Sequence, residues 1–361
     1  MLRAFIEQLT RLAPLADEQV TLAVEQLVNE QVPAETKADF LIALACKGET
    51  EQELAAFARE LRARSIQPPI DAATRAREIV DVCGTGGDRL GTFNISTTVA
   101  ILVAAAGVPV AKHGNRAITS QAGSADVLEA LGVPIGLPPE QAARSLREHN
   151  FAFFFAPQYH PAFKHIAPAR KLCAERGQRT LFNYLGPLLT PARPSAQLVG
   201  VPQPQLCQPI ARVLQTLGAR RGMVVCGRVP PSSSDVAGPS AQRGDAFLDE
   251  LSTLGENTVA EFYQERGFAT SILLPENFSL QPATLADLRG SDRATNAEVV
   301  RRILRGEERG PKRDAVLLNA AAALFVANKA KSLIHGWELA AELIDGGRAT
   351  AKLEELSSVK R

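Results

Sequence analysis

The order of apolar and polar positions divides the chain into two parts. Residues 1–65 follow the helical period of 3.6 without strand-like alternation. This pattern predicts three or four short helices, broken near Ala13-Pro14, Val32-Pro33 and Gly48-Glu49-Thr50. Thr50, with Glu53 three residues later, predicts a capping box at the start of the last of these helices. Residues 66–76 are expected to be a connector because of their two adjacent prolines.

From about residue 77 the pattern changes to short apolar strands that alternate with helices. Such alternation favours an α/β protein with a parallel or mixed sheet, buried on both faces by helices. The expected strands are residues 78–83, 108–111, 151–155, 197–200, 222–226 and 270–274. The expected helices are residues 97–106, 121–131, 139–148, 205–218, 294–305 and 313–328, with one or two more in 335–356. Residues 229–244, rich in Pro, Ser and Gly, are expected to be a long exposed loop.

Composition and charge exclude several classes of protein. The 361 residues are 45% hydrophobic and 22% charged, an ordinary globular balance. A net charge of +1 gives no general attraction to nucleic acid or anionic membranes. There is no secretory signal pattern and no apolar run of the roughly 18 residues that a membrane helix needs. The five scattered cysteines have no CxxC spacing, which fits a reducing cytoplasm better than a disulfide framework or a zinc site.

The most informative stretch is residues 84–97, Gly-Thr-Gly-Gly-Asp-Arg-Leu-Gly-Thr-Phe-Asn-Ile-Ser-Thr. It lies between a predicted strand and a predicted helix, which is the order that builds a phosphate cradle. Glycines let the backbone approach an anion closely, and the helix N-terminus stabilises negative charge. Asn94, Ser96 and Thr97 add side-chain donors and are candidate caps. An ordinary glycine loop with a capped helix is the alternative, since short glycine patterns are common.

Further polar clusters follow along the chain. Lys112–Arg116 lies at the end of a predicted strand, which is where ligands bind in open α/β sheets. A solvated turn would show the same sequence pattern. Residues 119–129 open a helix with small side chains, and residues 156–164 and 179–189 are dense in polar and turn residues. Arg170 is expected among turn residues rather than on a regular helix face, in a position suited to a carboxylate. The pair Asp249-Glu250 suggests Mg²⁺, or else the acidic first turn of a helix.

Together these clusters resemble the anthranilate phosphoribosyltransferase family, whose members join anthranilate to phosphoribosyl pyrophosphate (PRPP) in tryptophan biosynthesis. The resemblance extends from Lys47-Gly48-Glu49-Thr50 to Asn319–Leu324, and several ordered motifs are more specific than any one of them. It implies a small all-helical N-terminal domain, residues 1–70, joined by a segment near 165–190. A large α/β domain, residues 76–361, would have a central, mostly parallel sheet flanked by helices. The active site would lie between the domains, and the helical domain would form a homodimer.

The resemblance also implies roles for residues at matching positions. PRPP would contact Gly84, Gly87, Asp88, Thr92, Asn94, Ser96, Thr97, Lys112, Thr119 and Ser120. Anthranilate would contact Gly84, His113, Asn115, His160, Arg170, Gly186 and Pro187. The expected cofactor, Mg²⁺, would be held by Ser96, Asp249 and Glu250, with Asp245 a weaker rival. Catalysis is assigned to Arg170, Asn115 and His113, the last expected to act through contact with the acceptor rather than as a base.

The chain departs from the family pattern at three places. The loop before the acidic pair is longer than usual, and residues 171–178 are about three residues longer. Thr119 and Thr190 stand where Ser and Asn are usual. The first two departures bear on which acceptor is used, so a paralogue with another acceptor stays open.

Two other relatives also stay open as alternatives. One is a pyrimidine nucleoside phosphorylase, whose glycine-rich loop has a different sequence. The other is a non-catalytic paralogue that binds nucleic acid, which would show a basic stripe. The run from Arg301 to Arg313 is interrupted by Glu307 and Glu308 and is better explained as a solvated helix face.

Overall fold

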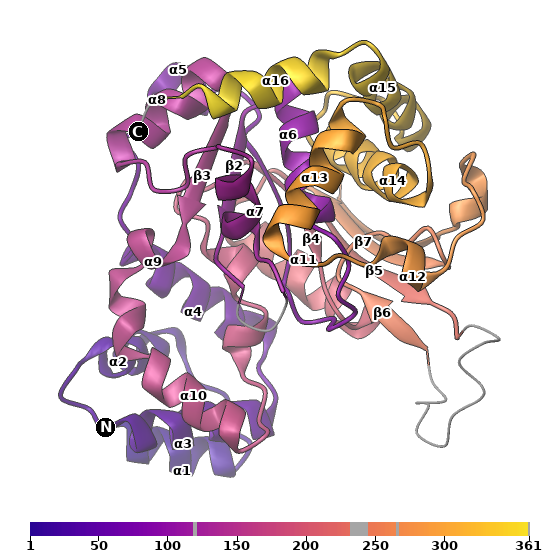
Figure 1. Cartoon of the computed structure of the whole chain (residues 1–361). Helices are drawn as coiled ribbons and strands as arrows, with labels where there is room; N and C mark the ends of the chain where they lie inside the picture. Colours follow the sequence, from indigo (N-terminus) through magenta and orange to yellow (C-terminus); the bar gives the residue numbers. More distant parts are fainter. Residues whose placement is uncertain (118–120, 232–244, 265–266, 360–361) are drawn as a thin grey trace.

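The larger part of the molecule is a mixed sheet with helices on both faces (Figure 1). The structure is a computed structural model and describes residues 1–117, 121–231, 245–264 and 267–359. Within these ranges the eight strands have the order β3-β2-β1-β4-β5-β7-β8, and β6 pairs with β5. The strands are β1 Val80–Gly84, β2 Val110–Gly114, β3 Phe151–Phe155, β4 Ala196–Gly200, β5 Arg221–Val229, β6 Ala246–Leu248, β7 Asn257–Tyr263 and β8 Gly267–Leu273.

Neighbouring strands from β3 to β5 are all parallel, whereas β7 runs antiparallel to both β5 and β8. The expected α/β class with a mostly parallel central sheet is therefore confirmed. The chain moves outward from β1 to β2 and β3, then returns to place β4 on the other side of β1. This reversal of direction between β1 and β4 is a topological switch point, where the carboxyl ends of the strands leave a crevice.

Helices cover the sheet and form a separate bundle below it (Figure 1). The bundle contains α1 Leu2–Thr10, α2 Asp17–Val28, α3 Ala34–Lys47 and α4 Glu51–Ala63. The other helices are α5 Ala72–Arg75, α6 Ile95–Ala105, α7 Ser124–Ala130, α8 Pro139–His149, α9 Ala156–Tyr159, α10 Ala167–Glu175, α11 Cys207–Thr216, α12 Leu285–Leu288, α13 Arg293–Leu304, α14 Pro311–Val326, α15 Leu333–Asp345 and α16 Arg348–Ser357. No helix of the described ranges is long and apolar enough to span a bilayer.

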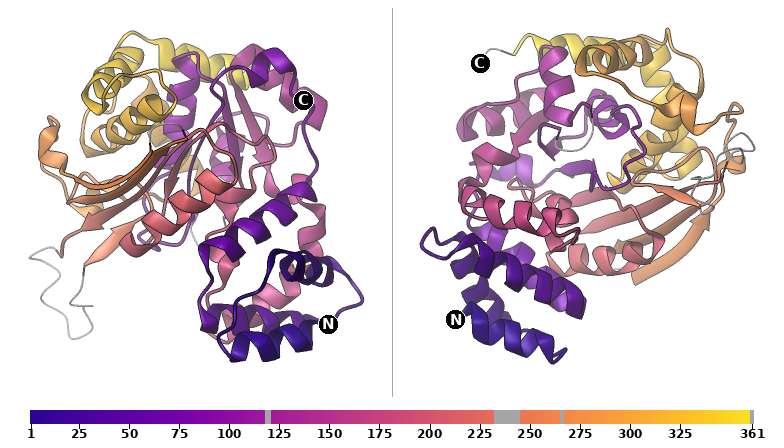
Figure 2. Two further views of the ribbon diagram at one scale, coloured as in Figure 1. Left: turned by 180° about the vertical axis from the view of Figure 1, so that it is seen from behind. Right: turned by 60° about the horizontal axis from the view of Figure 1, so that its bottom comes forward.

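Alternate residues of each central strand enter different hydrophobic cores. Leu198 packs in the core under α6, α13, α14 and α15, whereas Val199 packs in the core that contains α11 and the helical bundle. Figure 2 shows α11 on the face of the sheet opposite α14 and α15. The second core is continuous from α1 through α11 to β5, so burial of apolar surface attaches the bundle to the sheet.

The segment after β3 leaves the sheet and packs on the bundle. Ile166, Ala169 and Cys173 of this segment share the core of α1–α4. The Lys37 ammonium, on α3, donates to the carbonyl of His165 over 2.8 Å. The 3₁₀ helix η1 Pro161–His165 precedes α10, and η2 Leu181–Asn183 and η3 Gly186–Leu189 follow α10 and return the chain toward β4.

The predicted helical breaks agree with the four bundle helices, and Thr50 and Glu53 form the expected capping box. The structure differs from the predicted elements in several places. β6 and β7 were not predicted, because the polar residues of β7 obscure its alternation and pairing with β5 and β8 supplies its stability. Arg170 lies on the regular helix α10, not in a turn. Residues 232–244 of the expected loop lie outside the described residues.

Candidate active site

A cavity of about 700 Å³ lies at the switch point between β1 and β4. Nearly all of the residues predicted for the site line it, although they come from six separate segments of the chain. Gly87 is adjacent but does not line it, and Thr119 and Ser120 lie outside the described residues. The predicted residues that line the cavity are Gly84, Asp88, Thr92, Asn94, Ser96, Thr97, Lys112, His113, Asn115, His160, Arg170, Gly186, Pro187, Asp249 and Glu250.

The glycine loop forms one end of this cavity. β1 ends at Gly84, and α6 begins at Ile95, two residues earlier than predicted. Gly86 has a φ of 75°, a left-handed conformation that glycine adopts without steric cost. Asn94 precedes α6 but does not cap it through its side chain, which donates to the Ala122 carbonyl over 3.2 Å instead.

The carboxylate of Asp249 lies inside the glycine loop. Its Oδ2 atom accepts hydrogen bonds from the backbone amides of Gly86 over 2.5 Å and Gly87 over 3.2 Å. The backbone of Asp249 also packs directly on the end of β4, where a Cβ added to Gly200 would lie 1.6 Å from the Asp249 carbonyl oxygen. Gly200 was not predicted as a site residue, since an isolated glycine at a strand end carries no ligand signal.

The acidic pair is strongly buried, with 6% of Asp249 and 9% of Glu250 exposed. Burial, together with the charges of Asp88 and Glu250, raises the pKa of Asp249 well above its usual value. Burial also raises the pKa of Glu250 to about 7, and the Lys112 cation opposes this rise. The pair follows β6 in a bend, not in the first turn of a helix. Asp245 pairs with Arg228 over 2.9 Å, outside the cavity lining.

Lys112 places a buried cation beside these carboxylates. Only 1% of this residue is exposed, and it extends from β2 toward α6. Its ammonium donates to the Val82 carbonyl over 2.8 Å and to the Ser96 hydroxyl over 3.4 Å. The Ser96 amide in turn donates to Glu250 over 3.2 Å. A cation, a helix N-terminus and two acids therefore converge at one end of the cavity.

Two histidines form another part of the cavity lining. The rings of His113 and His160 are 5.2 Å apart between centroids. Burial, with a smaller effect of His160, lowers the pKa of His113 to about 3, and burial lowers the pKa of His160 to about 4. Nδ1 of His113 donates to the Gly186 carbonyl over 3.2 Å. Its Nε2 atom is buried without a hydrogen-bond partner in the described residues.

Arg170 also lines the cavity and lies on α10. Its guanidinium lies over the ring of Phe182, 5.3 Å from the centroid, and burial lowers its pKa. It forms no salt bridge within the described part of the chain. Phe163 packs edge-on against Phe182 with centroids 5.8 Å apart, and both rings line the cavity. These two phenylalanines lie within the polar clusters of the sequence but were not predicted as site residues.

Comparison with known proteins gives the same assignment along the whole chain. The model of the glycosyl transferase family a/b domain matches residues 76–238 and 241–350, and that of the family's helical bundle domain matches residues 3–65. Anthranilate phosphoribosyltransferase of Petrotoga mobilis is 42% identical over 99% of this chain and 96% of its own length. The chain belongs to the anthranilate phosphoribosyltransferase family. The enzyme of Rubrobacter xylanophilus is also 42% identical, over 100% of this chain and 98% of its own.

Solved structures of the family have the same fold. Anthranilate phosphoribosyltransferase from Thermus thermophilus matches with a TM-score of 0.84 and 40% identity, over 98% of both chains. The Saccharomyces cerevisiae enzyme, solved in complex with PRPP and Mg, matches with a TM-score of 0.80 over 99% of this chain and 98% of its own. At 24% identity the second likeness shows the fold alone. Both agree with a helical domain beside an α/β domain.

Proposed function

We propose that this protein transfers the phosphoribosyl group of PRPP to the amine of anthranilate, releasing pyrophosphate, as a step of tryptophan biosynthesis. One observation supports this most strongly. A single cavity joins an anion cradle of glycine amides to an end formed by an arginine, two neutral histidines and two phenylalanine rings. The first end suits a diphosphorylated sugar, and the second suits a flat aromatic amine that carries a carboxylate.

At the donor end, the chain would stabilise the departing pyrophosphate. Residues of the glycine loop, the first turn of α6 and Lys112 line the same cavity. The C–O bond at ribose C1 is expected to break ahead of attack, as in glycosyl transfer generally. Negative charge then develops on the leaving group, and fixed donors lower the barrier without having to reorient.

Mg²⁺ fits the acidic pair by the chemistry of its donors. Two buried carboxylates next to an anion cradle are the oxygen ligands that this cation prefers. The described residues contain no group of three His, Cys, Asp or Glu side chains placed to hold a metal ion. Substrate oxygens would therefore complete the coordination of an ion held by Asp249, Glu250 and Ser96. The bound ion would supply positive charge for the pyrophosphate.

At the acceptor end, Arg170 and Asn115 would hold the amine in line with ribose C1. His113 is neutral at pH 7 because burial lowers its pKa to about 3. Its Nδ1 donates to Gly186, so the unprotonated Nε2 is left as a hydrogen-bond acceptor for the incoming amine. Such a weakly basic ring supports contact with the acceptor rather than general-base catalysis.

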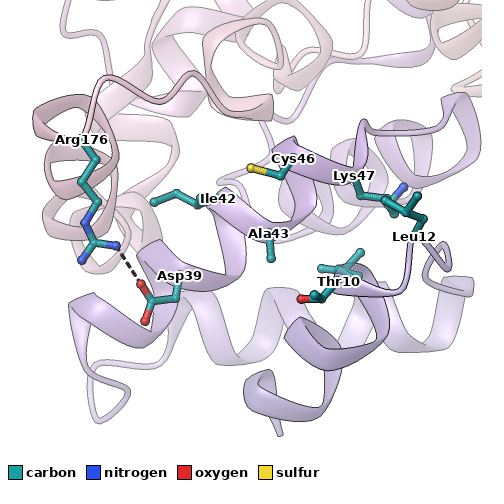
Figure 3. Close-up of a pocket in the computed structure, with 9 residues that line it drawn as sticks. Thr10, Leu12, Asp39, Ile42, Ala43, Cys46, Lys47 and Arg176 are labelled. Carbon is teal, nitrogen blue, oxygen red and sulfur yellow. Dashed lines mark hydrogen bonds and ion pairs between the residues drawn. The ribbon is translucent and has the colours of Figure 1, made fainter.

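We also propose a homodimer through the helical domain. A second cavity of about 360 Å³ lies between α1, α3 and α10 and is lined mostly by apolar side chains (Figure 3). Leu12 at its rim is 70% exposed, and the ion pair of Arg176 with Asp39 closes one side. An apolar hollow with a polar border is typical of an interface. Light scattering of Leu12→Asp should show a smaller mass than that of the parent protein.

A cytoplasmic location and the lack of a nucleic-acid partner are also proposed. All five cysteines are free thiols, which fits a reducing compartment. The arginines on and after α13 are paired with acids, for example Arg302 with Glu308 and Arg313 with Asp345. Their charges are thus largely balanced, which does not favour phosphate binding along this face.

One assay tests the proposed function directly. The protein is incubated with PRPP, Mg²⁺ and anthranilate, and the loss of anthranilate fluorescence is followed. Turnover that requires all three is the expected result. Binding of PRPP in calorimetry without turnover would indicate another acceptor, and absence of PRPP binding by folded protein would overturn the proposal.

A further inference from the structure

Asp81 is a fully buried carboxylate next to the acceptor end of the cavity. It lies on β1 with 0% of its surface exposed and does not line the cavity. Its Oδ2 atom accepts a hydrogen bond from the Thr190 hydroxyl over 2.6 Å, and its Oδ1 atom accepts one from the His113 amide over 3.4 Å. Asp81 therefore contacts two segments that line the cavity, although Asp81 itself does not line it.

Thr190 follows directly after η3, the 3₁₀ turn that carries Gly186 and Pro187. Its hydroxyl also lies 3.4 Å from the Pro187 carbonyl, but its one proton is assigned to Asp81 by the shorter distance. Gln197 on β4 donates to the same Pro187 carbonyl over 2.9 Å. Side chains of three neighbouring strands thus hold this turn: Asp81 of β1, His113 of β2 and Gln197 of β4.

A buried carboxylate is costly unless its hydrogen bonds and charge are met. Burial raises the pKa of Asp81 to about 6, while the Lys112 cation and the Thr190 hydroxyl act against the rise. The group is thus mostly ionised at neutral pH, and a hydrogen bond to an ionised acceptor is stronger than a neutral one. This strengthens the Thr190 contact, which holds the turn together with the contacts of His113 and Gln197.

We propose that Asp81 and Thr190 are positioning residues that set the geometry of the acceptor end, through the turn at Gly186-Pro187 and through His113. This proposal rests on the proposed function, because only that function names anthranilate as the substrate bound next to the turn. We call the hydrogen-bonded pair of Asp81 and Thr190 the clamp. It contacts the side of the cavity that would hold the acceptor, whereas the glycine loop that would hold PRPP has no contact with Thr190. Loss of the Thr190 hydroxyl, which leaves the Asp81 carboxylate and its interaction with Lys112 in place, should therefore weaken acceptor use and leave the donor site unchanged.

The test uses variants of nearly equal size. Thr190→Val removes the hydroxyl and should raise the KM for anthranilate about tenfold, while the Kd of PRPP measured by calorimetry stays within twofold. Thr190→Ser retains the hydroxyl and should restore the KM. Thr74→Val is the matched control: Thr74 is also buried, donates to Asp71 over 3.0 Å and lies outside the cavity lining. It should change neither constant.

Asp81→Asn provides a second measurement. If the two residues act as one clamp, the double variant with Thr190→Val should have no higher an anthranilate KM than Asp81→Asn alone. Equal weakening of both substrates, an unchanged KM in Thr190→Val, or additive effects would overturn the proposal. Failure of the proposed function is separate from this, because it would appear as absence of turnover by the parent protein.

Discussion

The Asp249 carboxylate accepts a hydrogen bond from the Gly86 amide over 2.5 Å, so it takes up a donor that the glycine loop would otherwise present to a phosphate. Gly87 and the Thr85 hydroxyl point to the same oxygen, each over 3.2 Å. An internal carboxyl oxygen therefore occupies the cradle. A diphosphate that enters the loop would meet a competitor for these amides.

Removal of this carboxylate should have opposite effects with and without Mg²⁺. In EDTA, calorimetry should show that inorganic pyrophosphate binds Asp249→Ala about tenfold more tightly than the parent, because the amides of Gly86 and Gly87 are freed. With Mg²⁺ and both substrates, kcat should fall about 100-fold, in the range seen for loss of one electrostatic stabiliser. Asp245→Ala, which removes an acid outside the cavity, should change neither. Equal pyrophosphate affinity in parent and variant would contradict the expected competition.

Arg170 should contribute mainly to recognition of the acceptor. Arg170→Ala removes a half-buried cation that has no carboxylate partner within the described residues, so the KM for anthranilate should rise by at least tenfold. The Kd of PRPP should stay nearly unchanged. Arg176→Ala is the control, since Arg176 directly follows α10 but forms an ion pair with Asp39. Similar losses for both substrates would show that Arg170 supports the structure of α10 rather than binding the acceptor.

Gly200→Ala should displace the acidic pair. The new Cβ would lie 1.6 Å from the Asp249 carbonyl oxygen, and backbone on both sides leaves no flexible group to move. Overpacking of this kind costs about 1–3 kcal/mol of unfolding free energy, and activity should fall at least tenfold. Gly136→Ala, whose Cβ would meet only a side-chain atom at 3.9 Å, is the control. Thermal denaturation and a kcat measurement on both variants test this, and a melting temperature and kcat of Gly200→Ala equal to those of the parent would contradict the expected clash.

The buried histidines should make stability depend on pH. Because the pKa of His113 is lowered to about 3, the unfolded chain binds more protons than the folded chain between that value and about 6.5. Stability is therefore lost as pH falls through 6.5, by about 1.4 kcal/mol per such histidine between pH 7.5 and 5.5. Urea unfolding of His113→Gln should show a loss smaller by that amount. The same substitution at exposed His335 is the control for the removal of any histidine. If the parent and His113→Gln lose the same unfolding free energy between pH 7.5 and 5.5, the lowered pKa of His113 is refuted.

Local order was predictable where a short stretch contains its own signal. The glycine loop between β1 and α6 and the capping box at Thr50 both depend on residues within a few positions of one another. β7 was not predictable in the same way, because its stability comes from β5 and β8 on either side. α10 was obscured by the prolines and polar residues around it, and packing of Ile166 and Cys173 on the bundle decides its helical state.

The sequence by itself determined the α/β class, the order of strand, glycine loop and helix around residues 84–97 and the family to which the chain belongs, because periodicity and contiguous motifs survive without a fold. Only the tertiary structure decided that Asp249 enters the glycine loop, that Gly200 leaves room for it and that Asp81 reaches Thr190. Asp249 is 49 positions from Gly200 and 163 positions from Gly86 along the chain, and Asp81 is 109 positions from Thr190. Contacts at such separations are made by the strand order β1-β4-β5, which no local pattern of residues encodes.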